Sequence, residues 1–156
     1  MADPTTKELK QQEARRLLRL FLNDTVELNR LIRRSESSDE KLDLALQLAI
    51  DDYNITPPPL GNSDIVNFPS LYLLLYGATI QVLRSAGLLH ARNDVIYNSG
   101  GLTVRLWDKT QLYQSWIRDF VTEYERKKLT LKISQNINAS LASGVISEYW
   151  TISRWW

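Results

Sequence analysis

The stretch FPSLYLLLYGATIQVLRSAGLL, residues 68–89, decides the fold of this chain because it is apolar on almost every side. A surface helix would show one apolar stripe, whereas nearly every residue between positions 71 and 83 is apolar here. Pro69 suits the first turn of a helix and Gly87 suits a C-cap. We therefore expect a central helix that is wrapped by other elements or by neighbouring subunits.

A membrane-spanning segment is the alternative interpretation of this stretch. A spanning helix needs roughly 20 consecutive apolar residues. Gln81 and Arg84 interrupt the run, and no cluster of Lys or Arg flanks it on one side. We therefore expect a buried helix and no membrane partner.

The totals favour one domain of ordinary composition. The chain has 156 residues, of which 44% are hydrophobic and 24% charged, and its net charge is +1. It contains no cysteine, which excludes disulfides, thiolate nucleophiles and cysteine metal sites. The polar N-terminal residues lack the apolar core of a secretory signal, so we expect none.

The N-terminal part predicts helix at residues 7–22, where apolar residues recur at three and four spacing. Asp24 followed by Glu27 resembles a capping box that would open a second helix over residues 25–33. The alternative is one long helix with a kink. The sequence leaves both possibilities open for residues 7–34.

A helix from about residue 39 to the prolines at positions 57–59 is the clearest local prediction. Ser37 or Ser38 can cap it, and Asp39 and Glu40 suit its first turn. Three successive prolines cannot continue a helix. Its predicted buried face comprises Leu42, Ala45, Leu46, Ala49, Ile50 and Tyr53.

Two short β-type runs, at residues 95–97 and 102–107, predict a hairpin over about residues 94–107. The connection between them contains Gly100 and Gly101, which suit a tight turn. An isolated two-stranded hairpin is marginal in water. We therefore expect it to lie on the helices or to pair with another chain.

The last helix is predicted at residues 110–136 and is followed by an extended C-terminal arm, residues 137–156. The fold class is therefore mainly α: a small helical bundle with an inserted β-hairpin and an extended arm. We divide the chain into a helical domain, residues 1–136, and a docking arm, residues 137–156. The predicted buried face of the last helix comprises Leu112, Trp116, Phe120, Val121, Tyr124, Leu129 and Leu131.

The sequence offers no persuasive active site. His90 is the only histidine and sits beside a helix end, where a structural or surface role is commoner than catalysis. Asp51 and Asp52 are adjacent and point to different sides of a helix, so they do not form a paired carboxylate site. We expect the acidic face of this helix to be exposed to solvent. The basic patch at residues 124–128 suits a solvated surface better than phosphate contact. We expect no enzymatic activity, no cofactor and no metal.

The C-terminus is unusually aromatic, and two of the five tryptophans end the chain. Exposed tryptophans favour aggregation unless something covers them, and aromatic residues with arginine anchor interfaces. We expect an arm that docks into another protein, although it could instead fold back on its own core. The candidate docking residues are Tyr149, Trp150, Arg154, Trp155 and Trp156.

Three phrases resemble a known family. These are LALQLAIDDYNITPPPLG (residues 44–61), FPSLYLLLYGATIQVLRSAG (68–87) and YNSGGLTVRLWDKTQLYQSWI (97–117). They are similar to small virion proteins of tailed bacteriophages, above all to the head-to-tail adaptor, or neck, proteins beneath the portal. The resemblance covers residues 38–136 and rests on element order rather than on a catalytic signature.

The resemblance implies a structural virion protein made in the host cytoplasm and placed in the phage neck. Its subunits would form a homo-oligomeric ring that continues the DNA channel, with DNA passing without sequence-specific binding. The arm would pack against the portal, and tail or neck proteins would be further partners. A neighbouring subunit would complete the hairpin by strand addition, through Tyr97, Gly100, Gly101, Val104 and Trp107.

Two other functions compete with the adaptor. One is another structural part of the virion, such as a tail-completion or baseplate protein. The other is a helical DNA-binding or regulatory module that would contact phosphates through a set of arginines. That set comprises Arg15, Arg16, Arg19, Arg30, Arg33 and Arg34.

Overall fold

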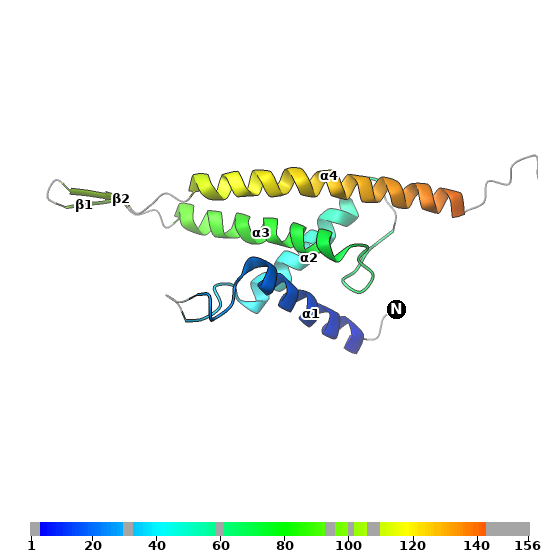
Figure 1. Ribbon diagram of the computed structural model, residues 1–156, viewed down its shortest axis with the longest axis horizontal. Helices are drawn as coiled ribbons and strands as arrows, with labels where there is room; N and C mark the ends of the chain where they lie inside the picture. The colour runs from blue at the N-terminus through cyan, green and yellow to red at the C-terminus, as the bar shows by residue number, and fades with distance from the viewer. Residues whose placement is uncertain are drawn as a thin grey trace, which may run out of the picture.

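The described chain is mainly helical, as predicted (Figure 1). The computed structural model describes residues 4–29, 33–58, 61–92, 96–99, 102–105 and 110–142. The elements in chain order are α1 (Pro4–Leu22), α2 (Asp39–Ile55), α3 (Leu71–Arg92), β1 (Ile96–Ser99), β2 (Leu102–Arg105) and α4 (Thr110–Ala142).

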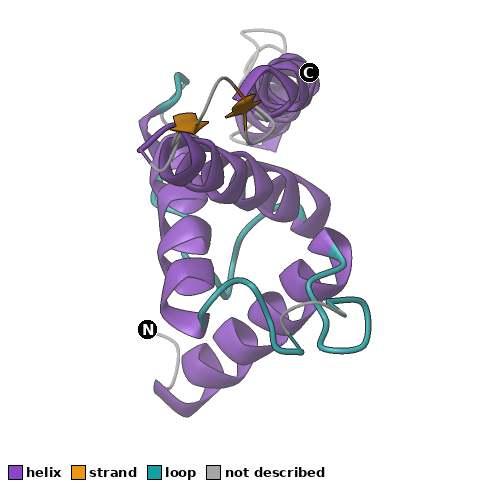
Figure 2. Ribbon diagram, turned by 90° about the vertical axis from the view of Figure 1, so that its left-hand side faces the viewer, coloured by secondary structure: helices purple, strands orange, loops and turns teal. Residues whose placement is uncertain are grey.

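Helix α3 is the central element, because it packs against α1, α2 and α4. Figure 1 shows α4 and α1 on opposite sides of α3. Figure 2 looks along the long axis and shows the C-terminal helix near the top and the N-terminal helix near the bottom. The chain therefore builds its core on both sides of the stretch that the sequence singled out.

The bounds of α3 correct the prediction at both ends. Ser70 precedes the helix, and its hydroxyl accepts a hydrogen bond from the Leu73 N–H at 3.4 Å, so Ser70 acts as the N-cap. Pro69 therefore lies before the helix rather than in its first turn. Gly87 lies inside α3, which continues to Arg92, so it is not a C-cap.

Helix α3 is also not buried on all sides within one chain. Leu74 and Ala78 are buried among α1 and α2, whereas Tyr72 and Leu88 are exposed. Among the described helices, residues 71–89 alone are long and apolar enough to cross a membrane, judged by length and composition. Its neighbours α2 and α4 carry charged residues along their length, and such residues are costly inside a bilayer.

Helix α2 confirms its prediction closely. It begins at Asp39, and the Ser38 side chain accepts a hydrogen bond from the Lys41 N–H at 3.3 Å. All six predicted residues of its inner face are buried. Five of them pack with Ala14 and Leu18 of α1, whereas Tyr53 packs with residues of α3 and α4. The recurrence of apolar side chains at three- and four-residue spacing therefore predicts which face of α2 packs against its neighbours.

The acidic face of α2 is paired rather than simply solvated. Arg15 of α1 donates to both carboxylate oxygens of Asp43, at 2.8 and 2.6 Å, and to Asp39 at 2.9 Å. Arg19 donates to Asp39 at 2.5 Å. Hydrogen bonding to Asp43 raises the pKa of Arg15, although its partial burial acts in the opposite direction. These ion pairs fasten α1 along α2.

The described part of the segment after α1 contradicts both predictions, a second helix that begins at residue 25 and one kinked helix; residues 30–32 lie outside the described residues. Helix α1 ends at Leu22, and Thr25 to Asn29 form a turn. Asp24 caps no helix. Its buried carboxylate accepts from the N–H groups of Glu36 and Ser37 at 2.6 and 2.9 Å. Asp24 therefore holds the two ends of the loop between α1 and α2 together.

Helix α4 runs antiparallel to α3 and is longer than predicted. Gly87 lies beside Tyr113, and Gly77 lies beside Tyr124. The helix continues to Ala142 rather than ending at Asn136, so residues 137–142, assigned above to the arm, belong to α4. Of its predicted inner face, Tyr124 is buried and Phe120, Val121 and Leu131 pack around it, whereas Leu112, Trp116 and Leu129 are exposed.

Candidate assembly surfaces

Helix α4 is held to α2 by a polar cluster that the sequence did not predict. The side chain of Lys128 is 2% exposed, and its Nζ donates to Asp52 Oδ2 at 2.7 Å and to Glu125 Oε1 at 2.8 Å. The Tyr124 hydroxyl donates to the same Asp52 oxygen at 2.9 Å. Asp52 therefore receives two donors from α4.

The groups of this cluster are suited to holding α2 and α4 together. Burial, followed by the charge of Asp52, raises the pKa of the Tyr124 phenol, so that hydroxyl stays protonated and donates. The adjoining cavity, lined by Asp52, Gly77 and Tyr124 among others, has a volume of about 40 Å³. A space of that size holds about one water. The cluster therefore works as an anchor between two helices.

Lys132 anchors α4 one turn further on. Its Nζ donates to the Thr56 carbonyl and, at 3.3 Å, to the Pro58 carbonyl. These carbonyls follow the C-terminal end of α2, where a cation complements the helix dipole. Burial, and then the charge of Lys128, lowers the pKa of Lys132. Its position at the end of α2 gives that helix a cap from a distant part of the chain.

A sequence signal for both lysines exists, although it is weak. Tyr124, Lys128 and Lys132 are four residues apart, so the lysines continue the apolar stripe of α4 rather than its charged face. The basic residues of the patch predicted at positions 124–128 therefore do not share one surface. Lys128 points inward, whereas Lys127 pairs with Glu123 at 2.7 Å and lies over the Tyr72 ring at 4.0 Å.

The C-terminal part of α4, which includes Lys132, carries an exposed apolar edge and extends past the N-terminal end of α3 (Figure 1). Figure 1 shows this part, in orange, running beyond α1 and α3. Leu129, Ile133 and Ile137 recur every four residues and are 50%, 47% and 52% exposed. We call these three residues the α4 ridge. Between residues 129 and 142 the only charged residue is Lys132, which is buried, so the ridge carries no charge.

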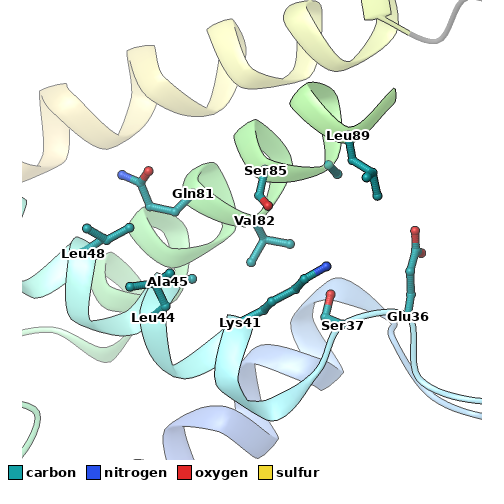
Figure 3. Close-up of a pocket in the computed structure, with 11 residues that line it drawn as sticks. Glu36, Ser37, Lys41, Leu44, Ala45, Leu48, Gln81, Val82, Ser85 and Leu89 are labelled. Carbon is teal, nitrogen blue, oxygen red and sulfur yellow. The ribbon is translucent and has the colours of Figure 1, made fainter. Parts of the chain in front are cut away.

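A second apolar surface lies at the other end of α3. It is a groove of about 150 Å³ between the first half of α2 and the second half of α3. We call it the α2–α3 groove (Figure 3). Glu36, Ser37, Lys41, Gln81 and Ser85 supply its polar lining. Its apolar lining comprises Leu44, Ala45, Leu48, Val82, Ala86 and Leu89.

The strands form a third candidate surface. They pair antiparallel with Ile96 opposite Arg105 and Tyr97 opposite Val104. Figure 1 places them beyond the ends of α3 and α4 that lie opposite the α4 ridge. Among the described elements the strands contact chiefly each other. Gly100, Gly101 and Trp107 of the predicted hairpin contact lie outside the described residues.

The predicted docking residues of the arm, Tyr149, Trp150, Arg154, Trp155 and Trp156, also lie outside the described residues. The comparisons found no match. That holds for models of protein families, for curated proteins and for solved structures. Within the described chain no group of three or more acidic or histidine side chains could hold a metal ion.

Proposed function

We propose that this chain is a structural virion protein of a tailed bacteriophage, an adaptor that forms a ring between portal and tail. One observation carries the proposal. Helix α4 leaves the helical core with an uncharged, exposed apolar ridge and leads directly into a segment with three tryptophans in its last seven residues. Such a helix and segment suit a protein that is completed by its neighbours in an assembly.

The arm contacts the portal in this proposal. It begins after Ala142, where α4 already projects from the core, and its fourteen residues (143–156) can span at most roughly 46–50 Å. Aromatic side chains bury on the order of 150–250 Å² each, so Trp150, Trp155 and Trp156 would supply most of the contact. A preformed groove between portal subunits would lower the entropic cost of ordering the arm.

The hairpin contributes to the ring. Two four-residue strands that contact chiefly each other leave their outer edges available for a third strand. A neighbouring subunit that pairs with an edge would extend the sheet. This role agrees with the position of the strands beyond the helices in Figure 1.

A nearly neutral chain suits a channel for DNA, because dense positive charge would retain phosphates. The alternative of a DNA-binding module is less well supported. Arg15 and Arg19, two of its six arginines, are already engaged by Asp39, Asp43 and Asp24. A DNA titration at increasing salt separates the two functions, since binding by phosphate contacts weakens steeply with salt.

The experiment that tests the adaptor is deletion of residues 143–156 in a phage complementation assay. The truncated chain should remain helical by circular dichroism, because α4 is anchored at Lys128 and Lys132. It should yield DNA-filled heads that leak or lack tails. A chain in which Leu9, exposed on α1, is replaced by Lys is the matched control and should complement fully. Normal virions from the truncated chain would contradict the proposal.

A further inference from the structure

Helix α4 is held to the core along most of its length and stands free at its C-terminal end. Between Phe120 and Lys132 each turn contains at least one buried or half-buried side chain. Gln135 accepts a hydrogen bond of 2.6 Å from the Tyr53 hydroxyl of α2. Positions 136–139 are then all exposed. One turn contains about 3.6 residues, so four exposed positions in a row leave no face of the helix covered by the described chain.

The sequence of this end gives the helix little support of its own. Residues 133–142, ISQNINASLA, contain two Ile, two Ser and two Asn, which have a lower helix propensity than Ala, Leu, Lys or Glu. None of these ten residues is charged, so no ion pair can form among them. The last turn also contains no basic residue to complement the helix dipole. A short helix without tertiary packing is marginal in water.

We propose that residues 137–142, the terminal segment of α4, open and close as a unit separate from the helical core. As helix, six residues span about 9 Å, whereas the same residues extended span up to about 20–22 Å. Opening would therefore lengthen the connection between the core and the chain beyond Ala142 by roughly 11–13 Å. The segment is an extendable link built into the end of α4.

The contacts on the core side of the segment limit how far the opening spreads. The buried Lys132 donates to the carbonyls of Thr56 and Pro58, and Gln135 is bonded to Tyr53. Opening past these residues would break the hydrogen bonds of a buried cation, which costs more than opening an exposed turn. The opening therefore stops just beyond Gln135.

Hydrogen exchange of the purified full chain, resolved to single amides by NMR, tests the opening. The amides of residues 139–142 should be slowed by no more than about tenfold relative to an unfolded chain, because exposed termini open at almost no cost. The amides of residues 124–132 should be slowed by at least about a thousandfold, because their exchange requires opening of the core. Equal slowing of the two sets would overturn the proposal.

A proline scan gives an independent measurement on the same helix. Proline inside a helix removes a backbone hydrogen bond and clashes with the preceding turn. If the terminal segment opens separately, Asn138→Pro should leave the thermal midpoint within about 2 °C of the wild type. Thr122→Pro is the matched control at an exposed position in the packed part of α4, and it should lower the midpoint by about 10 °C or prevent folding. A larger decrease for Asn138→Pro would place the segment in the cooperative core and overturn the proposal.

A use for the extendable link follows only if the chain is an adaptor, since an arm on a longer link could reach a portal site at a variable distance. Both measurements use the purified chain without a portal, so the opening is decided separately. Slow exchange at residues 139–142 would overturn the opening and leave the adaptor standing. Fast exchange in a chain that fails to bind portal rings would support the opening and contradict the adaptor.

Discussion

Asp51 and Asp52 are adjacent residues that differ in what they contact. The Asp52 carboxylate accepts from Lys128 and from the Tyr124 hydroxyl, both on α4. Asp51 accepts from the side-chain amide of Gln47 within α2. The rotation of the helix between the two positions gives one carboxylate a tertiary role and leaves the other at the surface.

Asp52→Ala should lower the free energy of unfolding by about 1–3 kcal/mol, because it leaves buried donors on Lys128 and Tyr124 with fewer acceptors. Asp51→Ala is the matched control and should change it by about 0.5 kcal/mol or less. Urea denaturation monitored by circular dichroism measures both values. Equal effects would show that the cluster does not hold α4 to α2.

The environment of Asp24 leads us to expect that the stability of the fold decreases at acid pH. Burial raises its pKa, but the N–H groups of Glu36 and Ser37, the Asn29 amide and Arg19 outweigh that effect, so the pKa lies below its usual value. A group whose pKa is lowered on folding stabilises the fold above its unfolded pKa of about 3.9. That stability is lost as the pH falls through the lower, folded pKa.

Asp24→Asn should therefore cost about 1–3 kcal/mol near pH 7, where the wild-type carboxylate is ionised and accepts from four donors. The loss of stability from pH 5 downwards should be shallower in the variant than in the wild type. Urea denaturation at a series of pH values measures the slope. Parallel slopes would contradict the role assigned to Asp24.

At the scale of elements, replacing either of two glycines in α3 by alanine should change the stability of the protein in opposite directions. A Cβ at Gly77 would lie 3.0 Å from the Ala49 Cβ and 3.1 Å from the Tyr124 ring. A Cβ at Gly87 would lie 3.6 Å from the Tyr113 Cβ, an ordinary contact. Gly77 therefore permits the close approach of α2 and α4 to α3, whereas Gly87 does not.

Gly77→Ala should destabilise the protein by about 1–2 kcal/mol, because overpacking costs about 1–3 kcal/mol and outweighs the helix propensity gained. Gly87→Ala should stabilise it by about 0.5–1 kcal/mol through that propensity. Thermal melting of the two variants side by side checks the pair. A stabilised Gly77→Ala chain would mean that the three helices are packed less closely than described.

The elements that the sequence predicts best are those that local pattern determines. The period of apolar residues and the Ser38 cap place α2 almost to the residue. Asp24 was misassigned because a cap and a loop-closing carboxylate have the same local sequence. Lys128 and Lys132 were missed because burial of lysine depends on Asp52 and on the Thr56 carbonyl, which are distant in sequence.

At the scale of the whole molecule, the chain has a helical core at its centre and exposed candidate contact surfaces toward its two ends. The strands lie beyond one end of α3 and α4, and the C-terminal part of α4 projects at the other end (Figure 1). The α2–α3 groove is lined by the half of α3 nearer the strands, and the α4 ridge lies on the C-terminal half of α4. The predicted docking arm begins after Ala142, at the ridge end. This arrangement suits a subunit that is stable by itself and is completed by neighbours on both sides.

The most direct test of the adaptor is a native mass measurement of portal rings from the same phage mixed with this chain. We predict that the full chain adds many copies, in a fixed number per portal ring, and that a chain lacking residues 143–156 adds none. A portal ring whose mass is unchanged by the full chain, or is increased equally by the truncated chain, would show that this protein is not a portal-bound adaptor.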